Sequence, residues 1–229
     1  MLTTDVFGTA LKDYLIGNEK ANLILRNSYG NPEKMPVSVF FREECDLTPL
    51  ERLAVESCHG RVLDIGAGVG AISRIAQTKY DLVALERSSD ACEVGKLLGV
   101  EQVVRGDIWE YGSTTFDTLL LLMNGIGIVE KLNKLTLFLL HLKKLLNTEG
   151  QILLDSSDLT YLYPKIKSFP RLGEISYQYE YKGRLGPWIN WLYFDKENLR
   201  KHALEAGFNT RILLDTEEDQ YLAQLTLSN

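Results

Sequence analysis

Cysteine and histidine are scarce in this sequence, and each occurs only three times among 229 residues. The cysteines, Cys45, Cys58 and Cys92, are odd in number and form no CxxC pair. This usage is typical of reduced thiols in the cytoplasm and not of a disulfide-bonded secreted domain. The histidines are equally dispersed along the chain, so the sequence predicts neither a zinc site nor any other bound metal.

Long apolar runs and an excess of positive charge are also missing. The longest apolar stretch, near residues 119–129, is too short and too interrupted by glycine to cross a bilayer. The first residues carry acids early and lack the apolar segment of a signal peptide. Lys and Arg number 25 against 31 Asp and Glu, a net charge of -6, which disfavours non-specific binding to nucleic acid or anionic membranes. The expected partner is therefore a small molecule, and the oligomeric state is left open.

The residues that are present predict one globular α/β domain. Apolar residues make up 45% and charged residues 24% of the chain, close to the averages of globular proteins. From residue 61 to residue 154, β-prone segments alternate with helical patterns, which is typical of a mostly parallel, doubly wound sheet. The expected strands are 61–65, 81–85, 102–105, 116–122 and 150–154, and the expected helices are 71–79, 90–98 and 132–146.

Different patterns flank this alternating region. Residues 5–25 show helical apolar spacing, residues 37–41 are β-prone, and Thr48, Pro49 and Glu51 have the spacing of a capped helix start. Alternating tyrosines in the tail predict an aromatic hairpin, followed by a capped helix and two antiparallel strands. These tail elements are 175–194, 195–206, 208–214 and 221–227. We expect a single domain made of an N-terminal lid (1–50), a cofactor-binding core (51–160) and a hairpin with the last sheet strands (161–229).

Three glycines at alternate positions, Gly66, Gly68 and Gly70, separate the first strand of the core from its helix. Glycine lets the backbone take unusual dihedral angles and lets a ligand approach without meeting a Cβ. The N–H groups at the start of the following helix favour an anionic group. The pattern Gly66-x-Gly68-x-x-Ala71 also satisfies the loose fingerprint of dinucleotide-binding proteins. The loop alone therefore leaves several nucleoside cofactors, and a tight turn without a ligand, as alternatives.

Three acids near the ends of the first three strands favour a particular kind of cofactor. Asp64 lies two residues before the first glycine, where a carboxylate repels a pyrophosphate but attracts an ammonium or sulfonium group. Glu86 ends the second strand and can accept hydrogen bonds from both hydroxyls of a ribose, as in nicotinamide-dinucleotide sites. Asp107 can accept a hydrogen bond from an adenine amine while Ile108 packs on the ring; a loop or cap aspartate is the alternative.

With these motifs in order, residues 60–160 resemble the class I S-adenosylmethionine-dependent methyltransferases. The matching segments are 62–70, 86, 106–108, 116–122 and 145–154, and the tail ending at 205–208 is similar to the family's last helix and strand. The resemblance implies an α/β, three-layer Rossmann-like doubly wound sheet of seven strands in the order 3-2-1-4-5-7-6, with strand 7 antiparallel. It implies S-adenosylmethionine as cofactor and S-adenosylhomocysteine as product. The cofactor-binding residues expected on this basis are Asp64, Gly66, Ala67, Gly68, Gly70, Glu86, Arg87, Asp107, Ile108 and Asn124.

The residues that would act on the methyl acceptor are less clearly marked. Asn124 and Asp155 follow the fourth and fifth strands, where open α/β sheets bind ligands, and they are the candidates for catalysis. Methyltransferases that act on amino groups of nucleic acids carry an acid or Asn, two prolines and an aromatic residue after the fourth strand. This chain has Asn124-Gly125-Ile126-Gly127, which weakens that interpretation. The candidates for acceptor binding are Arg42, Asp158, Tyr161, Tyr179 and Trp188.

The leading hypothesis is in-line transfer of a methyl group from S-adenosylmethionine to a small molecule. A first alternative is an NAD(P)-dependent oxidoreductase, suggested by the glycine pattern. A second is a non-catalytic protein that binds S-adenosylmethionine, suggested by the lack of an evident base. The sequence does not indicate the acceptor, the acceptor atom or the biological pathway.

Overall fold

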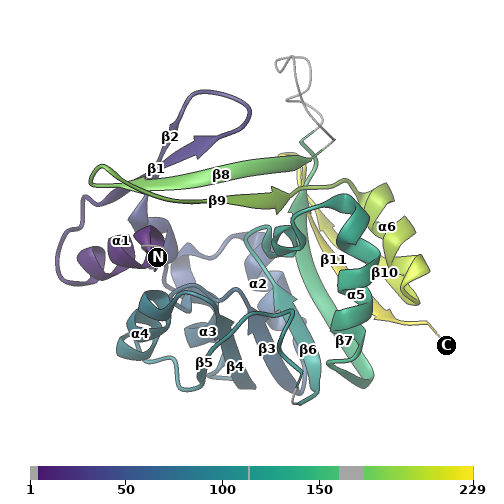
Figure 1. The fold of residues 1–229 in the computed structure, drawn as a ribbon. Coiled ribbons are helices and arrows are strands. Elements are labelled where there is room, and N and C mark those ends of the chain that lie inside the picture. Colours follow the sequence, from purple (N-terminus) through teal and green to yellow (C-terminus); the bar gives the residue numbers. More distant parts are fainter. Residues whose placement is uncertain (1–4, 113, 160–172, 229) are drawn as a thin grey trace.

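The computed structural model describes residues 5–112, 114–159 and 173–228 and combines two β-sheets with six α-helices in these ranges. A large twisted sheet carries helices on both faces, and a smaller sheet lies across one end of it (Figure 1). No helix in the described ranges is both long and apolar enough to span a membrane. The predicted α/β class is thus confirmed, with a second sheet added to it.

The large sheet has the strand order β10-β11-β7-β6-β3-β4-β5. Numbered by themselves in chain order, these strands have the order 3-2-1-4-5-7-6, as the resemblance implied. The five from β3 to β7 are parallel, whereas β11 runs antiparallel to both β7 and β10. Their bounds are β3 Arg61–Ile65, β4 Asp81–Glu86, β5 Val103–Arg105, β6 Phe116–Leu121, β7 Leu146–Ser157, β10 Phe208–Asp215 and β11 Gln220–Leu227.

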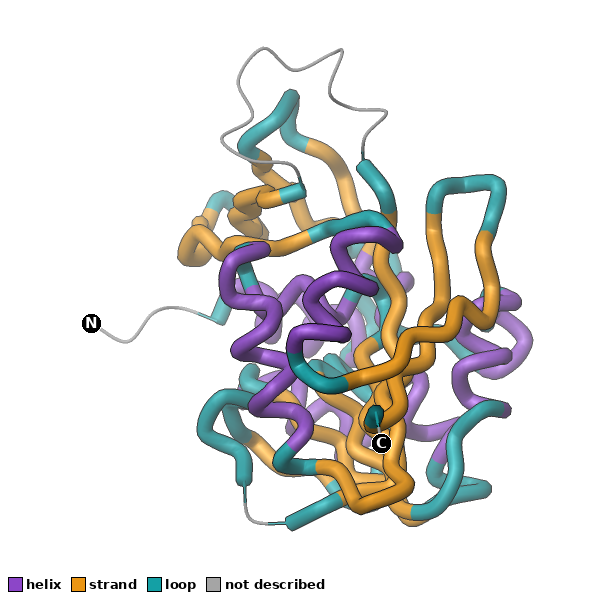
Figure 2. The backbone as a smooth tube through the Cα atoms, turned by 90° about the vertical axis from the view of Figure 1, so that its right-hand side faces the viewer, coloured by secondary structure: helices purple, strands orange, loops and turns teal. Residues whose placement is uncertain are grey.

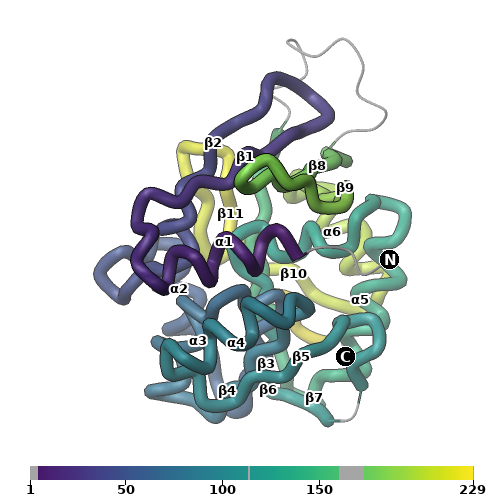
Figure 3. The backbone as a smooth tube through the Cα atoms, turned by 60° about the vertical axis from the view of Figure 1, so that its left-hand side comes forward, coloured from purple at the N-terminus to yellow at the C-terminus, as the bar shows by residue number. Residues whose placement is uncertain are grey.

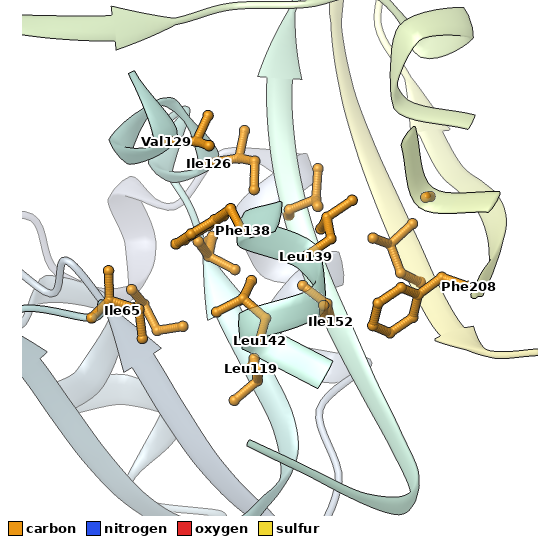
Figure 4. Close-up of a cluster of buried hydrophobic side chains, with 14 of the residues drawn as sticks. Ile65, Leu119, Ile126, Val129, Phe138, Leu139, Leu142, Ile152 and Phe208 are labelled. Atoms are coloured by element: carbon orange, nitrogen blue, oxygen red, sulfur yellow. The ribbon is translucent and has the colours of Figure 1, made fainter. Parts of the chain in front are cut away.

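Two hydrophobic cores lie on opposite faces of the large sheet. Alternate residues of β6 face them in turn: Leu119 and Leu121 pack on one side, and Leu120 packs on the other. Helices α5 (Leu135–Lys143) and α6 (Lys196–Glu205) cover the first face, and Figure 2 shows helices in front of the strands on this side. Figure 4 shows Phe138, Leu139 and Leu142 of α5 packed toward strand residues such as Ile152.

Helices α2 (Pro49–Glu56) and α3 (Ala71–Ala76) cover the second face, and α4 (Ser89–Leu97) follows β4. The start of α2 is as predicted, because Thr48 and Glu51 form a reciprocal capping box. Asp195 likewise caps α6 through the Asn198 N–H. Residues 132–134 form a short 3₁₀ turn, η4 (Leu132–Lys134), so α5 is shorter than predicted, and β7 starts earlier than predicted.

The second sheet has the order β2-β1-β8-β9 and is antiparallel throughout. Its strands are β1 Asn22–Asn27, β2 Glu33–Pro36, β8 Glu174–Tyr181 and β9 Arg184–Leu192. The aromatic hairpin is therefore confirmed. The helical interpretation of residues 5–25 holds only for α1 (Val6–Leu15), because the rest includes β1, which pairs with the distant β8.

The remaining short elements join the second sheet to the core. Residues 37–41 were expected to be extended, but η1 (Val37–Phe40) is a 3₁₀ helix, and η2 (Glu44–Asp46) follows it. Helix α1 lies between the second sheet and α4 (Figure 3). Lys12 of α1 forms ion pairs with Asp90 and Glu93 of α4, at 2.7 and 2.6 Å. The second sheet is thereby fixed above the carboxyl ends of the parallel strands.

Candidate active site

The glycine loop presents an open backbone surface at the end of β3. Gly66 (φ 76°) and Gly68 (φ 59°) both adopt the left-handed region that favours glycine. A Cβ built on Gly68 would meet no atom within 4 Å, and one on Gly66 would meet only Ile128 Cδ1 at 3.4 Å. Gly70 differs, because a Cβ there would overlap the side chain of Val100. The backbone at Gly66 and Gly68 is thus largely open, whereas Gly70 packs closely against Val100.

Glu86, at the end of β4, is fixed by backbone donors on either side. One carboxylate oxygen accepts a hydrogen bond from the Gly68 N–H at 2.9 Å, and the other accepts one from the Ser88 N–H at 2.7 Å. Burial raises the pKa of Glu86, and these backbone hydrogen bonds oppose the rise. Arg87 is exposed beside it and also favours the charged form. The carboxylate is therefore held at the edge of the glycine loop.

Asp64 is the buried acid of the site, with 4% of its surface exposed. It accepts a hydrogen bond from the Ser73 hydroxyl of α3 at 2.5 Å. Burial raises the pKa of Asp64 to about 6, and the nearby charge of Glu86 contributes to the rise. Ser73 could not be identified from the sequence, because a serine within a helix carries no signal of the strand residue that it contacts.

Asp107 and Ile108 follow β5, the neighbour of β4 in the sheet. Asp107 accepts a hydrogen bond from the Trp109 N–H at 3.0 Å, and the Ile108 carbonyl accepts one from His141 Nε2 at 2.6 Å. Trp109 also stacks on His141, with ring centroids 5.7 Å apart. His141 of α5 therefore supports this loop, a role that its place in an amphipathic helix did not indicate. Because β3, β4 and β5 are adjacent and parallel, all three predicted acids lie at the same sheet edge.

Asn124 begins η3 (Gly125–Val129), directly after β6. Met123 and Asn124 both have positive φ, at 60° and 54°. The Asn124 N–H donates to Asp155 at 2.7 Å, its side-chain oxygen accepts from the Ser157 hydroxyl at 2.9 Å, and its carbonyl accepts from Trp191 Nε1 at 2.9 Å. The two catalytic candidates, Asn124 and Asp155, are thus in direct contact.

Asp155 lies within β7 and is 6% exposed. Burial raises its pKa to about 7, and the charge of Glu51 contributes to the rise. Arg42 forms an ion pair with that Glu51 at 2.6 Å, and its Nε has no hydrogen-bond partner among the described residues. Arg42 therefore lies beside the N-terminus of α2, on the same side as Asp155, and is neutralised by Glu51.

The inner face of the second sheet is aromatic. Tyr179 stacks on Phe7 of α1 with ring centroids 5.5 Å apart, and the Tyr177 hydroxyl donates to the Tyr193 hydroxyl at 3.2 Å. Burial raises the pKa of Tyr179 to about 12, and the charges of Tyr193 and Glu86 contribute. Tyr179 is thus near the acid at the end of β4.

Trp188, another acceptor candidate, lies away from this aromatic face. Trp188 is 55% exposed and lies opposite Gln178, so it points to the outer face of the sheet, whereas Trp191 lies opposite the buried Ile175. Because side chains alternate along a strand, Trp191 takes the inward position expected of Trp188. The Asp158 N–H donates to the Asp219 carbonyl at 2.8 Å, at the end of β7. Tyr161 lies outside the described residues.

Comparison with solved structures gives a strong likeness over nearly the whole chain. No protein-family model and no curated protein matches the sequence. A solved structure of an S-adenosylmethionine-dependent methyltransferase from Bacteroides fragilis, in complex with S-adenosyl-L-homocysteine, is 34% identical with a TM-score of 0.91. The match covers 98% of this chain and 95% of that one.

More distant structures share only the fold. The sugar N-methyltransferase KedS8 from Streptoalloteichus is 15% identical, with a TM-score of 0.62 over 88% of this chain and 96% of that one. The glycopeptide N-methyltransferase MtfA, solved with S-adenosylmethionine, is 14% identical, with a TM-score of 0.55 over 78% of this chain and 92% of that one.

The described residues fit the cofactor of such enzymes. The backbone at Gly68 has open space where a Cβ would stand. Glu86 ends β4 and Asp107 follows β5 by two residues, so both acids lie where a nucleoside would bind. The buried carboxyl of Asp64 offers a counter-charge to an ammonium group. The comparison therefore favours the methyltransferase hypothesis over the nicotinamide-dependent alternative. The identity over nearly the full length of both chains shows that this protein belongs to the S-adenosylmethionine-dependent methyltransferases, enzymes that use S-adenosylmethionine and release S-adenosylhomocysteine.

Proposed function

We propose that this enzyme methylates a small-molecule acceptor that binds between the second sheet and the carboxyl edge of the large sheet. The observation that supports the proposal is the hydrogen bond from Trp191 to Asn124, which joins the aromatic second sheet to one of the two predicted catalytic residues. Aromatic side chains beside a few polar groups are typical of the lining of a small-molecule site. Two of the structures with this fold are named for acting on sugars and glycopeptides.

For the cofactor, we assign each part to one strand end. The open backbone at Gly66, Ala67 and Gly68 would hold the methionine part, with Asp64 near its ammonium group. Glu86 would accept hydrogen bonds from the ribose hydroxyls, with Arg87 outside it. Gly70 would act only by shaping the loop. When bound, the cofactor supplies an electrophilic methyl carbon on a positively charged sulfur.

At the adenine end, we assign Asp107 and Ile108. The Asp107 carboxylate would accept a hydrogen bond from the adenine amine, and Ile108, which is buried at the edge of the core, would pack on the ring. Trp109 and His141 would keep this loop in place through the contacts described above. The assignment is supported by the position of β5 beside β4, on which the ribose acid lies.

The residues on the acceptor side would orient the nucleophile, exclude water and take up a proton. Orientation and water exclusion supply most of what an in-line displacement needs. We assign Asp155 as the proton acceptor, because burial raises its pKa to about 7 and a general base works best when its pKa is near the ambient pH. Tyr179, on the inner face of the second sheet, would contact the acceptor. Arg42 and Asp158 would define the rim of the site.

We further propose a setting for the enzyme. The three free thiols favour a reducing compartment, the cytoplasm. The chain would act as one domain, in which residues 1–50 and the aromatic hairpin roof the core at 51–160. Calorimetry with S-adenosylmethionine and S-adenosylhomocysteine tests the cofactor site, and release of S-adenosylhomocysteine across a panel of small amines, alcohols and thiols tests the acceptor class. Absence of cofactor binding at millimolar concentration would overturn the proposal.

A further inference from the structure

A strained turn at the end of β6 is held by hydrogen bonds from both sheets. Met123 and Asn124 occupy the left-handed region consecutively, which residues with a Cβ rarely adopt, so the turn depends on contacts from outside. Two contacts come from β7 of the large sheet, through Asp155 and Ser157. The third comes from β9 of the second sheet, where Trp191 Nε1 donates to the Asn124 carbonyl at 2.9 Å.

Trp191 also packs tightly against the segment that follows the turn. A Cβ on Gly127 would overlap the Nε1 and Cδ1 atoms of the indole, so the backbone of η3 lies flush against the ring. A second link lies nearby, where the Glu174 carboxylate accepts from the Leu132 N–H at 3.1 Å. Because such packing leaves no gap, the second sheet cannot shift relative to η3 without breaking the bond to Asn124.

These contacts leave one polar group of Asn124 available. Its N–H, its carbonyl and its side-chain oxygen are all engaged, and no described residue accepts a hydrogen bond from its Nδ2. The turn lies at the end of β6, next to β3 in the sheet. Ile128 of the same η3 reaches to 3.4 Å from where a Cβ on Gly66 would stand. The Asn124 side chain is therefore at the edge on which the glycine loop opens.

We propose that Trp191 is a positioning residue for methyl transfer, which holds the backbone of the Asn124 turn so that the side chain, bound by Ser157, lies beside the sulfur of the bound cofactor. This inference rests on the proposed function, because it requires the cofactor's sulfur to lie at this edge. In this proposal, the second sheet not only covers the site but also positions one of its residues. The packing of β9 on η3 fixes the position of Asn124, which follows β6 of the large sheet. The site would therefore be complete only while the second sheet is packed on η3.

The Asn124→Asp variant turns the side chain into a charge probe of nearly unchanged shape. S-Adenosylmethionine and S-adenosylhomocysteine differ by one methyl group and one positive charge on sulfur, so a carboxylate that faces the sulfur strengthens binding of the first ligand alone. At pH 8.5 we expect the ratio of the Kd for S-adenosylhomocysteine to the Kd for S-adenosylmethionine to rise roughly tenfold, by calorimetry. An unchanged ratio would show that Asn124 does not face the sulfur and would overturn the proposal.

Adding Trp191→Phe to Asn124→Asp tests the positioning role. Phenylalanine keeps a ring but has no N–H, so the turn loses its link to the second sheet, and we expect the ratio to return to within about threefold of the wild-type ratio. Trp188→Phe makes the same change on the outer face of the same strand, and the tenfold effect should persist in its presence. A double Asn124→Asp, Trp191→Phe variant with the full tenfold effect would show that Trp191 positions nothing.

Gly127→Ala provides a second, independent perturbation. The added Cβ displaces the indole of Trp191 from η3. Like Trp191→Phe, it should therefore reduce the change in the Kd ratio that Asn124→Asp causes. If the Trp191→Phe protein does not fold, Gly127→Ala tests the same prediction. An unchanged Kd for S-adenosylhomocysteine shows that a variant keeps its cofactor site. Failure of the proposed function has a different signature, because the wild-type protein would then bind neither ligand.

Discussion

The carboxylate of Glu86 accepts a hydrogen bond from the backbone N–H of Gly68 at 2.9 Å, so the end of β4 is tied to the open side of the glycine loop. The second oxygen of the same carboxylate accepts from Ser88. The acid assigned to the ribose is therefore oriented by hydrogen bonds from the protein backbone. Such preorganisation lowers the entropic cost of binding.

Replacing Glu86 by alanine should weaken cofactor binding without unfolding the protein. The loss of two charge-assisted hydrogen bonds to a ribose is expected to raise the Kd for S-adenosylmethionine by roughly 10–100-fold. The melting temperature should change little, because the same substitution removes a buried charge. Calorimetry and thermal melting measure the two effects. Glu86→Gln keeps the shape and one acceptor oxygen, so its Kd should lie between those of the wild-type and Glu86→Ala proteins. Wild-type affinity in Glu86→Ala would contradict the assignment of Glu86 to the ribose.

Gly68→Ala and Gly70→Ala should separate ligand contact from packing. Both positions have positive φ, so each variant should lose about 1 kcal/mol from backbone strain. Only the Cβ at position 70 also overlaps Val100, so Gly70→Ala should melt at the lower temperature. At position 68 the Cβ faces open space, and the main loss should be in cofactor affinity. Equal melting temperatures for the two variants would argue against this division.

The fold was predictable from the sequence where local patterns and their order sufficed. The alternation of strands and helices, the cap at Thr48 and the aromatic hairpin are all local features, and the structure has them. The pairing of β1 with β8 was missed because it joins residues such as Leu25 and Tyr179, which are far apart in the chain. The alternation that marks β1 is too short to stand out from the helical spacing before it.

The candidate site was predictable from the sequence to about the same extent as the fold. Residues that follow strand ends, such as Asp64, Glu86 and Asn124, lie at one edge because parallel strands end together. Ser73 and His141 were missed because they act through contacts between elements, for which no sequence spacing exists. The sequence could not tell which of Trp188 and Trp191 faces inward, because that depends on the register of β9 against β8.

Asp155 should make the stability of the protein depend on pH between about pH 4 and pH 7. Burial raises its pKa to about 7 in the folded protein, so the folded state holds a proton that the unfolded state releases near pH 4. Stability is therefore highest below pH 4 as far as this group is concerned, and it falls as the pH rises toward 7. The shift corresponds to roughly 4 kcal/mol. Asp155→Asn does not titrate and should show a flatter pH dependence in denaturant unfolding.

Comparing the wild-type and Asp155→Asn proteins isolates the contribution of Asp155. Asp64, whose pKa is raised to about 6, contributes equally to the pH dependence of stability in both proteins. Asp155→Asn should also keep the Kd for S-adenosylmethionine within about threefold, since asparagine still accepts from the Asn124 N–H. Methyl transfer to an acceptor that must lose a proton should fall by roughly 100-fold or more. Parallel pH profiles of unfolding in the wild-type and Asp155→Asn proteins would show that Asp155 is charged in the folded state.

His141→Phe should weaken binding of the adenine end through the loop that His141 supports. A carbonyl oxygen can only accept, so His141 Nε2 carries the proton in its bond to Ile108. Phenylalanine can still stack on Trp109 but cannot donate, and we expect the Kd for S-adenosylhomocysteine and for free adenosine to rise by roughly 3–10-fold. His202→Phe is the matched control, since it removes a bond to Thr136 that lies between α5 and α6. His202→Phe should lower the melting temperature by a few degrees, as His141→Phe does, and leave both Kd values unchanged. A rise in Kd in both variants would show that the effect comes from general destabilisation of α5.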